Sequence, residues 1–177
     1  MYKSTPMNIQ RTSRLFLLGI LLTLLSLVET RAEVLQSGRA YAFSMPAEWR
    51  YASESVATLM HQRTGVKLAL AHADSAMLKI EHDAALGSEA YTLQIADNDI
   101  VVRAASVKGV NWAMAQLAQL LIAAGGRPLE CATLKSSPRF EHRGLMIDCS
   151  RHFRTIPELE SMIDAMNLLR LNVLHLH

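Results

Sequence analysis

The sequence predicts a mixed α/β protein: an α+β domain, in which helices pack on a sheet, followed by a strand–helix–strand unit of the parallel kind. YTLQI (91–95) and DIVVRAA (99–105) flank ADND, whose Asp and Asn residues suit a tight hairpin turn. Residues 107–122 repeat apolar side chains at helical spacing. Residues 142–177 consist of an apolar strand, an amphipathic helix and a second strand, which is the pattern of a βαβ unit.

The N-terminal segment has the layout of a secretory signal peptide. Lys3, Arg11 and Arg14 precede an uncharged apolar run of 14 residues, LFLLGILLTLLSLV (15–28), and ETRA (29–32) places small residues before a cleavage point near Ala32. The alternative is a membrane anchor, but such a helix would extend only about 21 Å against a hydrocarbon core of about 30 Å. We therefore expect residues 1–32 to be a signal peptide. The protein is then exported to a periplasmic, extracellular or lysosome-like compartment, with no membrane partner after cleavage.

Charge and cysteine content exclude several function classes. The net charge is only +2, and no basic stripe with interleaved aromatic residues is present, which argues against a nucleic-acid partner. Cys131 and Cys149 are the only cysteines, and they are compatible with one disulfide or with two small buried thiols. The sequence has no CxxC or Cys/His metal spacing, so no cofactor is expected, and it leaves the oligomeric state open.

Residues 33–137 are expected to form the compact α+β domain. SESVATLM (53–60) predicts a helix with Ser53 as N-cap and Gly65 as stop signal. VKLALA (66–71) and MLKIEH (77–82) have strand character. The helix over 107–122 should pack one face on the sheet, and KSSPRF (135–140) is interpreted as a linker. That face carries Val110, Met114, Leu117 and Leu121.

Residues 138–177 are organised differently. HRGLMID (142–148) lacks alternation, as in a parallel strand covered on both faces. Thr155 and Glu158 have capping-box spacing with Pro157 in the first turn, and LNVLHLH (171–177) is the next strand. The helix between them has an apolar stripe at helical spacing: Ile156, Leu159, Met162, Ile163, Met166 and Leu169.

The two strands are expected to lie parallel with a right-handed crossover. One βαβ unit leaves sheet edges and an apolar face uncovered, so it does not make a domain. The alternation of strand, helix and strand is typical of a longer α/β sheet or of a (β/α)₈ TIM barrel of roughly 250 residues. We expect this chain to contain the truncated start of such a barrel.

Asp148 and His177 are candidates for chemistry because they lie at carboxyl ends of the strands of this unit, where parallel barrels build their active sites, and His175 shares the strand face of His177. Asp148 could orient an arginine or histidine, act as a general base, or form a structural ion pair with Arg151 or Arg154. His175 and His177 point to the same side of a strand, which is compatible with a zinc site, with charge relay to a carboxylate, or with structural packing. Spacing alone favours the structural roles.

Two long stretches resemble a known family. FEHRGLMIDCSRHF (140–153) and IPELESMIDAMNLLRLNVLHLH (156–177) closely resemble the start of the catalytic barrel of β-N-acetylhexosaminidases, glycoside hydrolase family 20. LGSEAYTLQI (86–95) and AMAQLAQLL (113–121) resemble the small α/β domain that precedes this barrel. The resemblance implies three parts: the signal peptide (1–32), a small domain (33–137) and the first βαβ unit of a truncated barrel (138–177).

The resemblance also implies a reaction. The family removes terminal N-acetylglucosamine or N-acetylgalactosamine from oligosaccharides or glycoconjugates with retention, and the substrate's own acetamido oxygen acts as nucleophile. Arg143 matches the arginine that binds hydroxyls of the terminal sugar, although it precedes its strand, which fits the barrel rule poorly. His177 matches a rim histidine, and Asp148 matches a position of catalytic or structural support. The family's Asp–Glu catalytic pair has no counterpart in these residues, so we expect the chain alone to be inactive.

Two other classes remain open on the sequence. One is a secreted, non-catalytic α/β domain that binds another protein. The other is a metal-dependent hydrolase barrel that uses His175 and His177 as ligands. The turn SRHF (150–153) and the pair Arg143–Gly144 favour the glycosidase over both, by resemblance.

Overall fold

The structure is a computed structural model that describes residues 31–32 and 35–177. The predicted signal peptide therefore lies outside the described residues, except for Arg31–Ala32. These two form strand β1, which pairs antiparallel with β7 (Leu129–Glu130). Residues 31–177 form a single unit. Within the described part of the chain, no helix combines the length and apolarity needed to cross a membrane.

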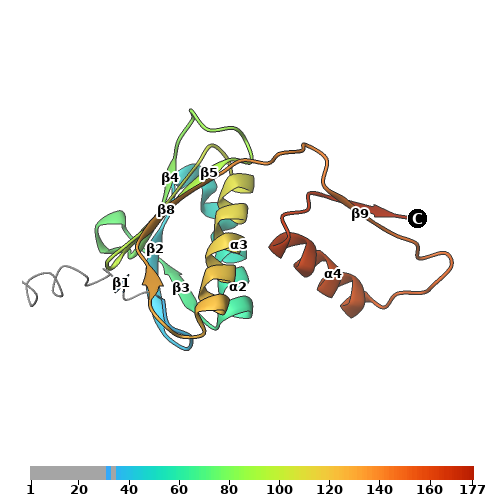
Figure 1. The fold of residues 1–177 in the computed structure, drawn as a ribbon, viewed down its shortest axis with the longest axis horizontal. Coiled ribbons are helices and arrows are strands. Elements are labelled where there is room, and N and C mark those ends of the chain that lie inside the picture. Colours follow the sequence, from blue (N-terminus) through green and yellow to red (C-terminus); the bar gives the residue numbers. More distant parts are fainter. Residues whose placement is uncertain (1–30, 33–34) are drawn as a thin grey trace, which may run out of the picture. The chain divides into compact units, whose positions relative to one another are not determined.

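A six-stranded mixed sheet forms the centre of the small domain, in the order β3-β2-β4-β6-β5-β8. The first four strands of this order run parallel to their neighbours, and β5 pairs antiparallel with both β6 and β8. Figure 1 shows α2 and α3 covering one face of this sheet. The strands are β2 (Ala40–Ser44), β3 (Lys67–Leu70), β4 (Leu78–His82), β5 (Tyr91–Ala96), β6 (Asp99–Ala104) and β8 (Ala132–Ser136).

The predicted hairpin is confirmed. β5 and β6 pair antiparallel from Tyr91 opposite Ala104 to Ala96 opposite Asp99, and Asn98 takes a left-handed φ of 57° in the turn. The segment interpreted as a linker is shorter than expected, because Lys135 and Ser136 belong to β8. Strand β8 alternates half-buried and exposed side chains at the edge of the sheet, which is a weak sequence signal.

Helix α2 (Ser53–Thr64) is confirmed, but Ser53 is not its N-cap. The 3₁₀ helix η1 (Ala47–Ala52) runs directly into α2, so the cap position falls on Ala52 and no side chain caps it. Gly65 ends the helix as predicted, with a left-handed φ of 73° that costs a glycine little. A second short 3₁₀ helix, η2 (Ala73–Ser75), leads into β4.

Helix α3 (Val107–Ala124) packs the predicted face on the sheet. Val110, Met114 and Leu117 are completely buried, and Leu121 at the end of the helix is half-buried. The Ser106 side chain caps the helix by accepting from the backbone N–H of Lys108 at 3.1 Å. Gly109 allows close packing, since a Cβ there would lie 2.6 Å from the backbone oxygen of Ala90.

The C-terminal residues form the predicted βαβ unit. Strands β9 (Gly144–Ile147) and β10 (Val173–Leu176) are parallel, and helix α4 (Ile156–Leu168) connects them. The capping box is confirmed: the Glu158 carboxylate accepts from the backbone N–H of Thr155 at 2.8 Å. The hydrogen bonds that the Glu158 carboxylate accepts, first from the backbone N–H of Thr155 and then from its hydroxyl, hold the pKa of Glu158 below its ordinary value.

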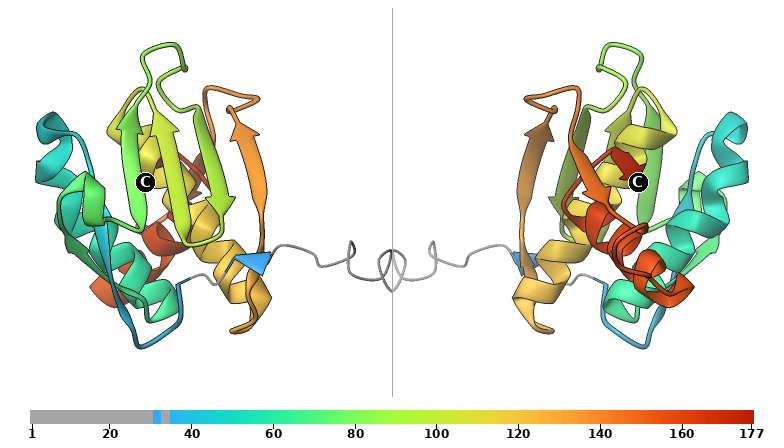
Figure 2. Two further views of the ribbon diagram at one scale, coloured as in Figure 1. Left: turned by 90° about the vertical axis from the view of Figure 1, so that its left-hand side faces the viewer. Right: turned by 90° about the vertical axis from the view of Figure 1, so that its right-hand side faces the viewer.

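The βαβ unit lies on the helical side of the small domain, and α4 packs against α3 (Figure 2). Gln119 donates to the backbone oxygen of Leu168 at 2.6 Å, and Arg63 pairs with Asp164 at 2.9 Å. The expectation that β9 is covered on both faces is wrong for the described residues, since the side chain of Met146 is exposed. Much of the α4 stripe is exposed as well. Its exposed members are Ile156, Ile163 and Leu169.

Candidate functional site

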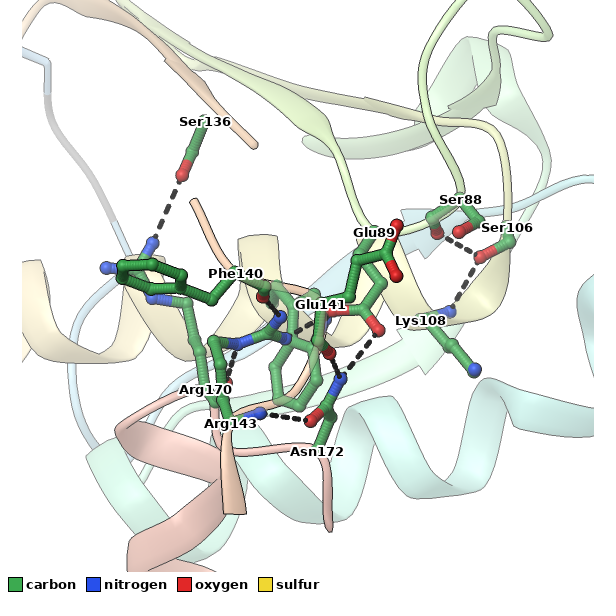
Figure 3. A network of polar contacts seen from close by, with 11 residues as sticks. Ser88, Glu89, Ser106, Lys108, Ser136, Phe140, Glu141, Arg143, Arg170 and Asn172 are labelled. Carbon is green, nitrogen blue, oxygen red and sulfur yellow. Dashed lines mark hydrogen bonds and ion pairs between the residues drawn. The ribbon is translucent and has the colours of Figure 1, made fainter. Parts of the chain in front are cut away.

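Arg143 lies immediately before β9 and turns its side chain toward the small domain (Figure 3). Its Nη2 pairs with a carboxylate oxygen of Glu89, which precedes β5. Its Nε donates to the backbone oxygen of Arg170 at 2.8 Å, and its Nη1 donates to that of Phe140 at 2.7 Å. The guanidinium carbon lies 5.9 Å from the ring centre of Trp112 on α3, within cation–π range. Contacts from four directions thus fix this side chain.

Glu89 is a nearly buried carboxylate, with 13% of its side chain exposed, and the side chain of Arg143 is 16% exposed. Besides its bond from Arg143, the Glu89 carboxylate accepts from Nδ2 of Asn172 at 3.1 Å and from Nε1 of Trp112 at 3.3 Å. Burial alone raises the pKa of the Glu89 carboxyl. The hydrogen bonds from Arg143 and Asn172, the positive charge of Arg143 and the bond from Trp112 outweigh burial and lower that pKa. Glu89 is therefore a charged partner at neutral pH.

Asn172 connects the start of β10 to the same cluster. Its side-chain oxygen accepts from the backbone N–H of Arg143 at 3.0 Å, and its Nδ2 also donates to the backbone oxygen of Glu141 at 2.7 Å. Its backbone N–H donates to the backbone oxygen of Arg143 at 2.8 Å. One amide side chain thus aligns the two parallel strands at their starting ends and contributes to the pairing of Glu89.

Arg170 has a left-handed φ of 59°, just after α4, where glycine is the usual residue. An L-residue in this region costs about 1–2 kcal/mol. Its side chain donates to the hydroxyl of Tyr91 at 3.0 Å and to that of Ser136 at 3.3 Å, while its backbone oxygen holds Arg143. These contacts offset the backbone cost and join the end of α4 to β5 and β8.

A cleft of about 250 Å³ borders this cluster. Glu89, Trp112 and Arg143 line it together with Arg139 and Arg170. An aromatic face beside a few convergent polar groups is the usual composition of a small-molecule site. We call the cluster formed by Glu89, Trp112, Arg143, Arg170 and Asn172 the Arg143 cluster.

The structure brings Asp148 and His177 together at the other end of the βαβ unit. Nδ1 of His177 lies 3.7 Å from Oδ1 of Asp148. Asp148 also accepts from the backbone N–H groups of Ser150 and Arg151, each at 3.0 Å, and pairs with Nε of Arg151 at 3.1 Å. The predicted ion pair with Arg151 is thus confirmed. These contacts stabilise the turn after β9, which is a local structural task.

Arg143 and Asp148 lie at opposite ends of β9. At about 3.3 Å per residue, the five steps between them separate their backbones by about 16 Å. The structure confirms that Arg143 lies at the entering end of the strand, because β9 begins at Gly144. The site residues taken from the sequence therefore lie in two separate clusters, one around Arg143 and one with Asp148 and His177.

The remaining sequence-predicted groups have simple surroundings. The side chain of His175 is exposed on β10. Among the described residues, no group of three or more His, Cys, Asp or Glu side chains is placed to hold a metal ion, so the zinc interpretation of His175 and His177 gains no third ligand. Cys131 is an exposed free thiol and Cys149 a half-buried one, so the two do not form a disulfide in the structure.

Two models of one family match consecutive parts of the chain. The model described as glycosyl hydrolase family 20, domain 2, matches residues 25–135, which is more than half of the chain. The model described as glycosyl hydrolase family 20, catalytic domain, matches residues 140–177. The chain belongs to glycosyl hydrolase family 20. The resemblance on which the sequence analysis relied is thereby confirmed.

Relatives of this family 20 chain include proteins named as hexosaminidases. The chain is 35% identical over 102 residues to a β-N-acetylhexosaminidase of Cellulomonas fimi, which covers 56% of the chain and 21% of the relative. It is 30% identical over 146 residues to a β-hexosaminidase of Akkermansia muciniphila, covering 79% of the chain and 28% of the relative. The chain thus spans less than a third of the length of these relatives.

Solved structures of family 20 share the fold. The β-N-acetylhexosaminidase of Streptomyces coelicolor superimposes with a TM-score of 0.68 at 25% identity, over 83% of this chain and 32% of that one. A mutant β-hexosaminidase of Streptomyces plicatus, in complex with the product GlcNAc, superimposes with a TM-score of 0.70 at 22% identity, over 84% of this chain and 31% of that one. The mixed α/β fold predicted from the sequence agrees with these structures.

Sequence reasoning missed most of the Arg143 cluster. Glu89 lies within LGSEAYTLQI (86–95), a stretch that indicated the family but carried no assigned role. Trp112 lies within the helix predicted over 107–122 but off its apolar face, and its ring lies 5.9 Å from the guanidinium of Arg143. Asn172 and Arg170 gave no signal, because their partners are distant in sequence or are backbone atoms.

Proposed function

We propose that the protein containing this chain is an exported exo-acting β-N-acetylhexosaminidase. In this proposal it removes terminal, non-reducing N-acetylglucosamine or N-acetylgalactosamine from an oligosaccharide or glycoconjugate. The observation that carries the proposal is the match of two successive family 20 models, domain 2 and catalytic domain, to residues 25–135 and 140–177. Relatives named β-N-acetylhexosaminidase and β-hexosaminidase support it.

The organisation that we propose follows the same order. Residues 1–32 act as the signal peptide, residues 33–137 form the small domain, and residues 138–177 begin a (β/α)₈ barrel. The parallel pairing of β9 and β10 around α4 supports the barrel. The exposed apolar side chains of Met146, Ile163 and Leu169 also support it, because further barrel elements would cover them.

The mechanism that we propose is substrate-assisted and retaining, as the family resemblance implies. A glutamic acid donates its proton to the leaving oxygen as the glycosidic bond breaks, and the acetamido oxygen bonds to the anomeric carbon to give an oxazolinium ion. Water then opens this ion with retention of configuration. The Asp–Glu pair of this scheme has no counterpart among the 177 residues, so we expect the chain by itself to have no turnover.

Arg143 is the residue that we propose for binding hydroxyls of the terminal sugar. The barrel rule favours the end with Asp148 and His177, whereas the resemblance favours Arg143. Three of the five N–H groups of the guanidinium are bonded to Glu89, Arg170 and Phe140, which leaves two for a ligand. The neighbouring cleft and the ring of Trp112 support this choice. In this scheme Asp148, His175 and His177 remain candidates for support of the active site, with support of the barrel's structure as the alternative.

The test compares two substrates with the protein expressed from the complete gene. The p-nitrophenyl β-glycoside of N-acetylglucosamine should be hydrolysed, and the first product should retain the β configuration in a time-resolved proton NMR spectrum. The corresponding glucoside, which lacks the acetamido nucleophile, should be cleaved at least 1,000-fold more slowly, roughly the scale of losing one catalytic group. Equal rates on both glycosides would contradict substrate assistance. A protein that does not hydrolyse the N-acetylglucosaminide would contradict the proposed function.

A further inference from the structure

We infer that strand β1 belongs to the mature protein, so that the export leader ends at Thr30 rather than at Ala32. This inference rests on the export proposed above and refines the boundary of its leader. In the processing step, water hydrolyses the peptide bond between Thr30 and Arg31, which leaves a carboxylate on Thr30 and a new amino terminus on Arg31. The mature chain then begins with the two residues of β1.

The pairing of β1 is the first observation that carries the inference. Arg31 lies opposite Glu130, and Ala32 lies opposite Leu129, in an antiparallel register. Among the residues that the structure describes, β1 is the only strand that pairs with β7. Loss of β1 would therefore leave backbone N–H and C=O groups of β7 without their ladder partner, and such a loss weakens the strand.

Strand β7 holds part of the core of the small domain, so its pairing matters for the fold. The side chain of Leu129 is 7% exposed and belongs to the hydrophobic core cluster. Leu35, which follows β1 closely in the chain, is buried in the same cluster. The chain is thus part of the folded domain from β1 onward, in agreement with the single unit that residues 31–177 form.

The extent of the family match is the second observation. The model described as domain 2 of glycosyl hydrolase family 20 matches from residue 25, upstream of β1. A leader that ends at Ala32 would remove both residues of β1 together with the first part of this match. A leader that ends at Thr30 keeps β1 and a larger part of the match. Both observations therefore favour a boundary before Arg31.

The sequence admits this cut. A leader needs an apolar stretch of about 7–15 residues and small side chains at the −3 and −1 positions before the cleaved bond. LFLLGILLTLL (15–25) meets the first requirement, and Val28 and Thr30 occupy the −3 and −1 positions before Arg31. For the alternative cut after Ala32, these positions are Thr30 and Ala32. Since the pattern admits both cuts, the pairing of β1 decides between them.

The first experiment determines the amino terminus of the protein exported by the cells that carry the complete gene. N-terminal sequencing and the intact mass identify the first residue, and we expect Arg31. An exported protein that begins at Glu33 or later would overturn the inference, because such a protein lacks β1.

Two variants that introduce the same bulky residue distinguish the two cuts. Val28→Tyr changes the −3 position of the cut after Thr30 and leaves both positions of the cut after Ala32 intact, whereas Ala32→Tyr does the reverse. We expect Val28→Tyr to slow removal of the leader about 10-fold or more in a pulse-chase immunoblot, the scale of one misfit side chain in an enzyme pocket. Ala32→Tyr should be processed at the wild-type rate. The opposite result would overturn the inference.

Hydrogen exchange tests whether β1 supports β7. It compares two forms of the protein expressed from the complete gene, one that begins at Arg31 and one that begins at Glu33. The amides of Leu129 and Glu130 should exchange about 10-fold faster in the shorter form, because their strand has lost its partner. Equal exchange in both forms would overturn the inference.

Failure of the inference and failure of the proposed function are distinguishable. A wild-type protein that stays inside the cell with residues 1–30 attached would overturn the proposed export and this inference with it. Hydrolysis of the N-acetylglucosaminide tests the proposed glycosidase activity separately, since it does not depend on where the leader ends.

Discussion

Replacement of Arg143 by alanine should strongly destabilise the folded chain. The substitution leaves the Glu89 carboxylate, with 13% of its side chain exposed, without its cationic partner. Removing one member of a buried ion pair costs about 3–5 kcal/mol. Glu89 keeps its bonds from Asn172 and Trp112, so we expect the lower end of this range, about 3 kcal/mol. For a unit of this size, that corresponds to a fall in Tm of roughly 6–12 °C.

The control for this prediction is Arg103→Ala. Arg103 pairs with Glu81 at 2.8 Å on the open face of the sheet, where the two side chains are 38% and 45% exposed. Exposed pairs contribute about 0–1 kcal/mol, so this variant should lose less than 1 kcal/mol. Adding Glu89→Gln to Arg143→Ala should restore part of the stability, because it removes the unpaired charge.

Urea unfolding of the 177-residue chain, followed by tryptophan fluorescence, measures all four proteins. Trp112 lies within the cluster and reports on its opening. A loss for Arg143→Ala that does not exceed the loss for Arg103→Ala would refute the reasoning. So would a double variant that is less stable than Arg143→Ala, because the unpaired carboxylate would then not be the source of the cost.

Three further predictions concern the supports of the cluster. Gly109→Ala should gain about 1 kcal/mol of helix propensity but lose about 2 kcal/mol to crowding against Ala90, so thermal melts should show a net loss of stability of about 1 kcal/mol. The control is Gly87→Ala, whose new Cβ would meet nothing closer than 3.9 Å, and its stability should stay within about 0.5 kcal/mol of the wild type. Ser106→Ala should lose about 1–2 kcal/mol in urea unfolding, since the hydroxyl caps α3 and also bonds the loop before β5, and a result within 0.5 kcal/mol of the wild type would contradict this. The pKa of Glu89 in the folded chain lies below its ordinary value of 4.5, so its contribution to stability is present above that pH and is lost as the pH falls through the folded pKa. Glu89→Gln should therefore lose less stability than the wild type as the pH falls below 4.5, and parallel curves of stability against pH would contradict the assignment.

Much of the fold could be predicted because its signals are local. The hairpin depends on ADND between two apolar strands, α3 on a repeating apolar face, and α4 on the capping box of Thr155 and Glu158. Sequence reasoning mistook or missed several elements, among them the inner strand β2, the edge strand β8 and the 3₁₀ helix η1. Strand β8 lies at an edge and alternates half-buried with exposed side chains, and η1 displaces the cap of α2 from Ser53 to Ala52.

The site could be predicted only in part, because its contacts are not local. Arg143 and Glu89 are 54 positions apart, and Arg170 and Tyr91 are 79 apart. No periodicity or spacing rule connects such residues, and two of the partners of Arg143 are backbone oxygens that carry no side-chain identity. Family resemblance indicated Arg143 itself. The proximity of Asp148 and His177 followed from strand order, because both residues come directly after parallel neighbours.

The most direct test of the central claim is a crystal structure of the protein expressed from the complete gene with N-acetylglucosamine bound. The account predicts that Arg143 donates to a sugar hydroxyl while Glu89 still holds the other side of its guanidinium. A sugar bound without contact to Arg143, for example at the end with Asp148 and His177, would contradict the assignment of the Arg143 cluster as the sugar site.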